Sequence, residues 1–213
     1  MIPHSVVVLL ACVASVALAG NDDRPLAGQR PIAAATAVSL GSPLDLSPMP
    51  AYPPVAPGPS QTISGQCYVV TDGGQRSNLA QVEVCIYPQS EFDWYAREVD
   101  VRSKARFEAM KSIACPENFA ALSLPEMDRS LAAAEVLRHD LHVVWQALPT
   151  AAARTKTDAA GRFSVTHRVA PPYVVFAVGS RALGDATEYY RWQIPSGAIP
   201  DSLQVVLSND RLR

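Results

Sequence analysis

Apolar and polar positions alternate along two separate stretches of the chain, and a longer region of helical period lies between them. In residues 61–70 apolar side chains such as Ile63 alternate with polar ones, and residues 82–87 repeat the pattern. A period of two is the pattern of a strand with one buried face. Thr71–Gly74 interrupt the alternation with turn-forming residues. The pattern therefore predicts two strands joined by a short loop.

Between the two alternating stretches, over residues 90–149, the apolar period is that of a helix. A first helix is predicted over about Glu91–Ala114, where Pro116 stops it, and a second over about Pro125–Leu148. The apolar stripes of the two helices consist of Phe92, Tyr95, Val99, Met110 and Ile113, and of Leu137, Leu141, Val144, Trp145 and Leu148. Two helices of similar length with a short connection are typical of an antiparallel hairpin.

The period of two returns in residues 153–207. Its clearest part is Thr157–Val165, where Asp158 and Gly161 have the chemistry of a β-turn between two strands. Further strands are predicted at 173–178, 188–194 and 203–207. The total of about seven strands is typical of a β-sandwich. The predicted fold class is therefore mainly β: a seven-stranded β-sandwich domain over residues 61–213, with a two-helix insertion (about 90–149) between the second and third strands.

The N-terminal residues have the features of an export signal followed by a linker. Residues 1–19 form an apolar run that ends in an A-x-A cleavage site, and a polar segment follows at once, which argues against an uncleaved membrane anchor. Lipidation at Cys12 is disfavoured because the apolar run before it is too short. Residues 20–60 contain nine of the 18 prolines and are predicted to be a disordered linker, either a spacer or a leader without a role.

These features predict an exported chain that is periplasmic, in the cell envelope or secreted. After signal cleavage no window is long and apolar enough for a membrane span. The formal net charge of −2 gives no basic footprint for nucleic acid. The partner is therefore expected to be an unidentified protein or a glycan.

Cysteine usage leaves the disulfide pattern open. Cys67, Cys85 and Cys115 remain after the signal, and an odd count allows one bridge with a spare thiol, an intermolecular bridge or none. Strand alternation places Cys67 toward the core and Cys85 on the opposite face. We therefore favour Cys85 and Cys115 as the pair over Cys67 and Cys85. No C-x-x-C motif suggests a redox site or a zinc knuckle.

The only metal-like constellation is Glu135, His139 and His142, which lie within about 60° of one another on the second predicted helix. Imidazole and carboxylate groups suit zinc or iron. The trio lies opposite the apolar stripe, however, so a solvated polar face is the better interpretation. The sequence predicts no cofactor.

Catalytic motifs are absent from the sequence: no G-x-S-x-G, H-E-x-x-H or P-loop occurs. His167 is the only histidine in the predicted sandwich, and it is interpreted as a core residue with satisfied hydrogen bonds. Three aromatic residues, Trp94, Tyr189 and Trp192, are candidates for stacking on a sugar ring. Aromatic residues at strand spacing are more often part of a core, so both interpretations stay open.

Four segments of the chain resemble the carboxypeptidase regulatory-like domain, a transthyretin-like (prealbumin-like) β-sandwich. They are Ile63–Cys67, Leu79–Val84, Thr157–Phe163 and Tyr173–Phe176, in the order I-x-G, V-x-V and T-D-x-x-G-x-F. The resemblance covers residues 61–88 and 153–207 and implies a non-catalytic accessory or surface module.

Two departures limit what the resemblance implies. The only lysines are Lys104, Lys111 and Lys156, and none lies in the opening strands, so the Lys–Asn isopeptide bond of some relatives is not expected. The chain ends Ser-Asn-Asp-Arg-Leu-Arg and lacks the Tyr-Arg-Gly-Ser ending of the transthyretin-like hydrolases. The sequence therefore predicts a non-catalytic exported β-sandwich that serves in interaction or structure. A glycan- or peptide-binding domain is the alternative.

Overall fold

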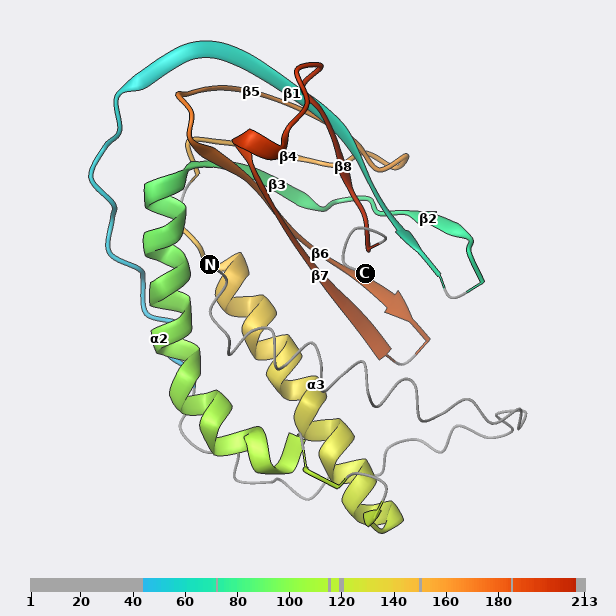
Figure 1. Ribbon diagram of the computed structural model, residues 1–213. Coiled ribbons are helices and arrows are strands. Elements are labelled where there is room, and N and C mark those ends of the chain that lie inside the picture. Colours follow the sequence, from blue (N-terminus) through green and yellow to red (C-terminus); the bar gives the residue numbers. More distant parts are fainter. Residues whose placement is uncertain are drawn as a thin grey trace. The chain divides into compact units, whose positions relative to one another are not determined.

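A computed structural model describes residues 44–71, 73–114, 116–118, 121–149, 151–184 and 186–209 (Figure 1). The predicted signal peptide, Cys12 and Cys115 lie outside these residues. The chain divides into two compact units. We call Leu46–Val99 with His142–Arg213 the sandwich unit, and Met1–Asp45 with Asp100–Leu141 the hairpin unit.

The sandwich unit contains two sheets of four strands each among its described residues. The first sheet consists of β1 (Pro57–Val70), β2 (Arg76–Asn78), β5 (Arg162–Val169) and β8 (Gln204–Leu207). The second has the order β4-β3-β6-β7 and consists of β4 (Ala153–Lys156), β3 (Glu83–Pro88), β6 (Tyr173–Leu183) and β7 (Ala186–Pro195). All pairs are antiparallel except β1 with β8.

The main core consists of the alternate residues that the two sheets direct toward each other. In β5 every second residue is buried, from Phe163 to Val169, as the period of two predicts. Ile63 and Cys67 of β1 and Val84 and Ile86 of β3 are fully buried in the same core. The predicted inward direction of Cys67 is therefore confirmed.

The turn before β5 is built as the sequence predicts. The Asp158 carboxylate accepts hydrogen bonds from the backbone N–H groups of Ala160 and Arg162, each at 2.8 Å. Gly161 has a φ of 71°, a left-handed conformation that favours glycine. A Cβ at this position would lie 2.2 Å from the carbonyl oxygen of Cys67. Asp158 therefore shapes a turn, and Gly161 lets β1 approach it closely.

The second sheet is covered on both of its faces. The first seven residues of β6, Tyr173–Gly179, are all buried, and its outward-facing Phe176 is 2% exposed. The cover on the outer face comes from the ends of two helices, α2 (Gln89–Ala114) and α3 (Leu124–Gln146). A strand that is buried on both faces is expected to be almost continuously apolar. This double cover explains the unbroken apolar run in the sequence.

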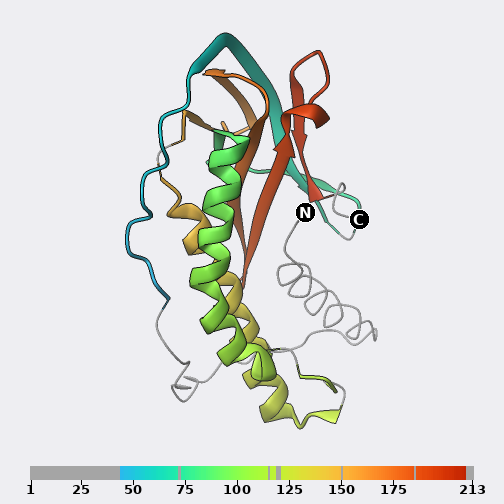
Figure 2. The ribbon, with the colours of Figure 1, turned by 60° about the vertical axis from the view of Figure 1, so that its left-hand side comes forward.

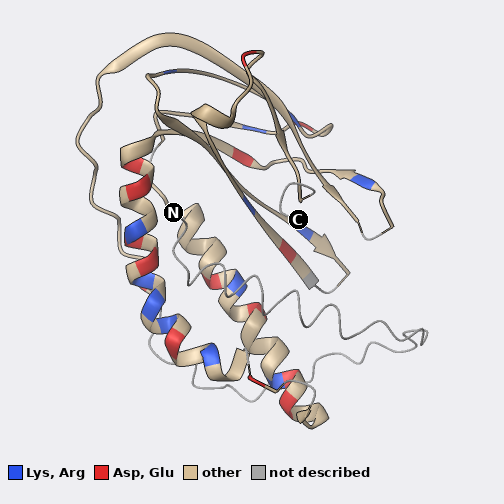
Figure 3. Cartoon of the chain, in the orientation of Figure 1, with Lys and Arg blue, Asp and Glu red and all other residues tan. Residues whose placement is uncertain are grey.

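In the hairpin unit α2 and α3 run antiparallel, as predicted. Arg106 of α2 pairs with Asp140 of α3, whereas Ala114 at the end of α2 accepts a hydrogen bond from the hydroxyl of Ser130, nearer the start of α3. Lys, Arg, Asp and Glu are interspersed along both helices (Figure 3). No helix among the described residues is both long and apolar enough to cross a membrane.

A capping box sets the start of α3, one residue before the predicted Pro125. The carboxylate of Glu126 accepts hydrogen bonds from the backbone N–H and the hydroxyl of Ser123, at 2.8 Å and 2.6 Å. The Ser123 carbonyl in turn accepts from the N–H of Met127 at 2.9 Å. These bonds satisfy backbone groups that a helix end leaves unpaired. Leu124 can therefore begin the helix.

Two parts of the predicted fold class are corrected. The described residues form eight strands where the sequence predicts about seven, because the short β2 pairs with the end of β1. The helices therefore follow the third strand. The fold is mixed, since α2 and α3 span 26 and 23 residues and rival the strands in extent. The arrangement of two sheets with an inserted helical hairpin agrees with the prediction at this coarser level.

Candidate functional site

The helix ends are attached to the outer face of the second sheet through a cluster of aromatic rings. Phe92 of α2 stacks on Trp145 of α3, with ring centroids 5.9 Å apart. Both rings also contact Phe176 of β6, at 5.1 Å and 5.2 Å. Tyr87 of β3 contacts Phe92 and Tyr95, each at 6.0 Å. We call these five residues the aromatic cluster, and it forms a second core outside the sandwich.

A cation lies at the edge of the aromatic cluster. The Arg191 guanidinium of β7 lies 4.6 Å from the ring centroid of Trp145, and burial lowers the Arg191 pKa to about 10. Trp145 belongs to the last turn of α3, where the negative end of the helix dipole favours a positive charge. Among the described residues Arg191 has no ion-pair partner. The Trp145 ring therefore lies where a carboxylate usually would, and Nη1 of Arg191 is buried without a hydrogen-bond partner among the described residues.

A cavity of about 70 Å³ lies beside the aromatic cluster, and its lining includes Glu83, Cys85, Trp145 and Arg154. Burial, followed by the nearby Glu83 carboxylate, raises the pKa of the Cys85 thiol to about 12. A thiol with so high a pKa is a poor nucleophile. The Tyr87 hydroxyl donates to the carbonyl of Pro149 at 2.8 Å, which fixes it in a structural role. The cavity can hold small polar molecules, but its thiol is not activated.

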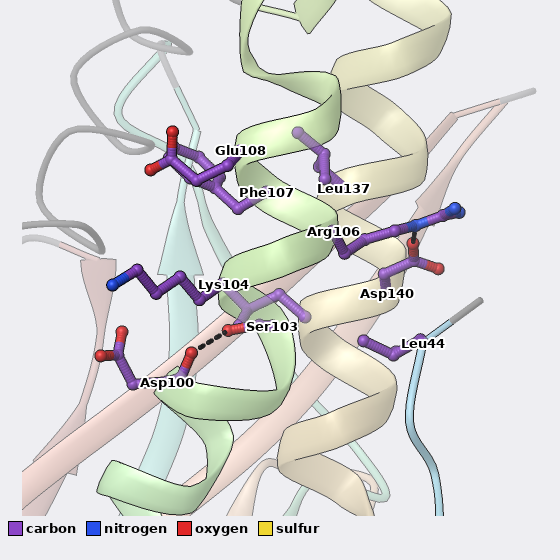
Figure 4. Close-up of a pocket in the computed structure, with 10 residues that line it drawn as sticks. Leu44, Asp100, Ser103, Lys104, Arg106, Phe107, Glu108, Leu137 and Asp140 are labelled. Atoms are coloured by element: carbon purple, nitrogen blue, oxygen red, sulfur yellow. Dashed lines mark hydrogen bonds and ion pairs between the residues drawn. The ribbon is translucent and has the colours of Figure 1, made fainter. Parts of the chain in front are cut away.

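A second cavity, of about 50 Å³, lies within the hairpin unit (Figure 4). The guanidinium of Arg106 and the carboxylate of Asp140 form an ion pair at 2.8 Å in its wall, and Leu44 closes one side. The two side chains are only 13% and 18% exposed. A pair this well shielded fixes how the two helices align, because breaking it would leave a buried charge unpaired.

A Pro-rich segment packs on α2 close to its start. Tyr52 lies against Trp94 with ring centroids 6.1 Å apart, and Trp94 meets Tyr95 edge to face at 5.1 Å. The Tyr95 side chain hydrogen-bonds both the backbone of Tyr52 and the side chain of Glu91. This part of the predicted linker is therefore attached to the sandwich unit.

The three candidate stacking residues do not form one surface. Trp192 lies in the main core, 5% exposed, and stacks on Tyr190 at 5.6 Å. Tyr189 lies on the opposite face of β7, with its ring 4.8 Å from His142. Trp94 is half-buried beneath Tyr52. The sugar-stacking interpretation of Trp192 is therefore wrong, since its ring is not accessible from solvent.

The candidate metal ligands are also kept apart by other contacts. Glu135 forms an ion pair with Arg138, and His142 is 8% exposed against Tyr189. Among the described residues no three His, Cys, Asp or Glu side chains gather as a metal site. The solvated-face interpretation is wrong for His142, because β7 covers that end of α3.

Cys67 and Cys85 are both buried, and neither forms a disulfide with another described residue. Cys85 faces away from the main core, as predicted, yet it is only 8% exposed. The pairing of Cys85 with Cys115 stays a prediction, since Cys115 lies outside the described residues.

His167 is a core residue, as predicted, but only half of its hydrogen-bonding capacity is used. Nδ1 accepts from the backbone N–H of Val169 at 3.2 Å, while the buried Nε2 has no partner. The directly opposed residue of β1, Gln61, has an unpartnered buried Oε1. Burial lowers the pKa of His167 below its ordinary value of 6.5.

His167 is expected to weaken the fold as the pH falls. The unfolded chain binds a proton at His167 below about pH 6.5, whereas the folded chain resists protonation, so stability is lost from there down through the lowered folded pKa. The loss is at most about 1.4 kcal/mol for each pH unit. Denaturant titrations from pH 7.5 down to about pH 5 should show a shallower loss for His167→Phe than for the wild type. The variant His139→Phe, at an exposed position, serves as the control, and an unchanged slope in His167→Phe would contradict the assignment.

Sequence reasoning missed the role of Arg191 and, although it allowed Tyr52 to pack locally on the domain, it did not identify Trp94 as the partner of Tyr52. Arg191 could have been found as a single cation between the aromatic residues of β7, but strand period alone does not show that helices cover that face. Tyr52 stands in a Pro-rich stretch without regular period, so nothing in the pattern indicates its contact with Trp94. Both depend on segments that are distant in sequence.

No protein-family model matches the chain, and no curated protein matches it. Among solved structures it is similar to a Pseudomonas aeruginosa protein provisionally described as carbohydrate-binding, at 16% identity and a TM-score of 0.31, over 72% of this chain and 89% of that one. It is also similar to the pilus backbone protein RrgB of Streptococcus pneumoniae, at 16% identity and a TM-score of 0.22, over 68% of this chain and 40% of that one. A structure of the full-length major pilin RrgB is similar at 15% identity and a TM-score of 0.22, over 69% and 30%. TM-scores this low do not establish a common fold.

Proposed function

We propose that this chain is a non-catalytic interaction module, exported to the periplasm, the cell envelope or the exterior, that binds a protein partner through its helical hairpin. Its sandwich is of the carboxypeptidase regulatory-like type in this proposal, on the strength of the four sequence segments that resemble that domain. The buried thiols support a structural use of the sandwich, because burial raises the pKa of both Cys67 and Cys85 to about 12.

The observation that carries the proposal is an apolar stripe left exposed on α3. Leu124 is 78% exposed and Leu131 is 45% exposed, with the half-exposed Met127 between them. These three residues have the spacing i, i+3, i+7 and lie on one side of the helix. Ala133 and Leu137, which face α2, lie about 130° away around the axis. The exposed stripe therefore does not serve the packing of the hairpin, and such surfaces mark interaction sites.

Crosslinking on intact cells tests this assignment. The wild-type chain should yield one reproducible protein partner, and the double variant Leu124→Glu/Leu131→Glu should recover it at least tenfold less, because charges at both positions oppose burial of the stripe. Leu183→Glu is the matched control, since Leu183 is a 46% exposed leucine on β6.

All three proteins should unfold at the same denaturant concentration, because both leucines of the double variant and the control leucine are exposed. Equal recovery of the partner by the double variant and the control would rule out the stripe as the binding surface. If the wild-type chain yields no partner at all, the interaction role itself is wrong.

A further inference from the structure

The segment Leu46–Ala56, which we call the strap, runs beside α2 in the sandwich unit (Figures 1 and 2). It contains Pro48, Pro50, Pro53 and Pro54 and forms no helix or strand. Proline restricts the backbone before binding, so a Pro-rich segment loses little conformational entropy when it docks. The strap therefore has the composition of segments that bind aromatic surfaces in an extended form.

Tyr52 makes defined contacts that seat the strap on α2. The ring of Tyr52 lies on Trp94, and the backbone of Tyr52 hydrogen-bonds the side chain of Tyr95. Tyr95 is 1% exposed and is fixed by its contacts with Tyr87 and Trp94 and by its hydrogen bond to Glu91. The surface formed by Glu91, Trp94 and Tyr95, which we call the strap site, is therefore rigid and prepared for this ligand.

The apolar side chains at the two ends of the strap are largely exposed to solvent. Leu46 and Val55, which flank the contact, are 53% and 48% exposed. Segments with few buried apolar contacts open locally at low free-energy cost. When the strap leaves, the strap site exposes the Trp94 indole ring and the Tyr95 hydroxyl with its partner Glu91, which are the groups that seat Tyr52.

We propose that the strap site is a binding site for Tyr-Pro-Pro segments, and that its ligand in trans is the strap of a second copy of this chain. A second copy carries the same strap sequence as the one that is seated on the site. The link from Tyr52 to β1 is only Pro53–Ala56, so an exchanged strap would hold two copies close together. This inference goes beyond the proposed function and does not depend on the apolar stripe of α3.

The attached strap competes with any strap added in trans. A short linker gives it an effective concentration in the millimolar range, and the affinity seen in trans falls by the fraction of sites that are open. Binding of a free strap peptide should therefore appear only when the attached strap is disabled. The variant Tyr52→Ala removes the ring that holds the strap and leaves the strap site intact.

The first test titrates a synthetic peptide of residues 46–56 into the full-length Tyr52→Ala protein by calorimetry. The peptide should bind at least tenfold more tightly to this variant than to the wild type. A Tyr52→Ala version of the peptide should not bind, and the protein variant Tyr52→Ala/Trp94→Ala should not bind the wild-type peptide. If the wild-type peptide fails to bind the Tyr52→Ala protein, the strap site is not a peptide site.

The second test asks whether a second copy is the source of the ligand. A Tyr52→Ala chain has an open site and a defective strap, whereas a Trp94→Ala chain has an intact strap and a defective site. Each should sediment as a monomer alone, and their mixture should form a one-to-one dimer. Peptide binding in the first test without dimer formation in the mixture would overturn the second copy as the occupant. Matching unfolding curves for the single variants exclude misfolding as the cause.

Discussion

Replacing Phe92 by alanine is expected to lower the free energy of unfolding by about 3–5 kcal/mol, the range for a large buried aromatic residue. Phe92 is 0% exposed and contacts Tyr87, Trp145 and Phe176 in the aromatic cluster. Its removal leaves a cavity where both helices meet the second sheet. Denaturant unfolding followed by Trp fluorescence measures the loss.

The matched control for this change is Phe107→Ala, in the same helix. Phe107 is only partly buried against the core of the hairpin unit, so its loss should cost less than half as much. Equal costs for the two variants, or a cost for Phe92→Ala below about 1.5 kcal/mol, would show that the aromatic cluster does not hold the helices to the sheet.

Replacing Gly161 by alanine is expected to cost about 3 kcal/mol or more. A φ of 71° is unfavourable for alanine, and the new Cβ would lie 2.2 Å from the carbonyl oxygen of Cys67. The β5 turn and β1 would have to separate, and the hydrogen bond from the Cys67 N–H to the Gly161 carbonyl, at 2.7 Å, would be strained. Thermal and denaturant unfolding both measure this loss.

Gly197→Ala is the control for the Gly161 substitution. A Cβ at Gly197 would meet no atom within 4 Å, and its φ lies outside the left-handed region. Its free energy of unfolding should change by no more than about 0.5 kcal/mol. A small effect at both glycines would mean that the turn before β5 can relax without cost.

Patterns of local period predicted most of the elements, because most of the strands and helices bury a single face. The turn at Asp158 and Gly161 follows from the chemistry of these two residues, and the alternation of β5 follows from its single buried face. The bounds of α2 agree with prediction within two residues at its start, since Pro88 and the apolar stripe mark the change of period.

The contents of the candidate sites could not be predicted in the same way. Trp192 and Tyr189 alternate along β7 as expected, but only the structure shows that Trp192 lies in the main core while the face with Tyr189 lies against α3. The contact of Tyr52 with Trp94 joins a segment without period to a helix. Such contacts depend on which surfaces the fold brings together, which no local pattern contains.

The structure also changes the interpretation of the helical insertion. Local period shows a hairpin placed between strands, as if the sandwich were complete without it. The buried outer face of β6, with Phe176 beneath Phe92 and Trp145, shows that the helix ends finish the second sheet. The insertion is therefore part of the folding unit at its base.

The parallel pairing of β8 with β1 has a consequence for when the protein can fold. Ser64 lies opposite Gln204, and the Asn209 side chain hydrogen-bonds both the N–H and the carbonyl of Val70, at 2.7 Å and 2.8 Å. These contacts close a very long loop, which is slow and entropically costly. A growing chain must therefore leave one edge of β1 open until β8 has been synthesised. The first sheet cannot be completed before that point, and the unfinished chain is exposed to strand-pairing with other molecules until then.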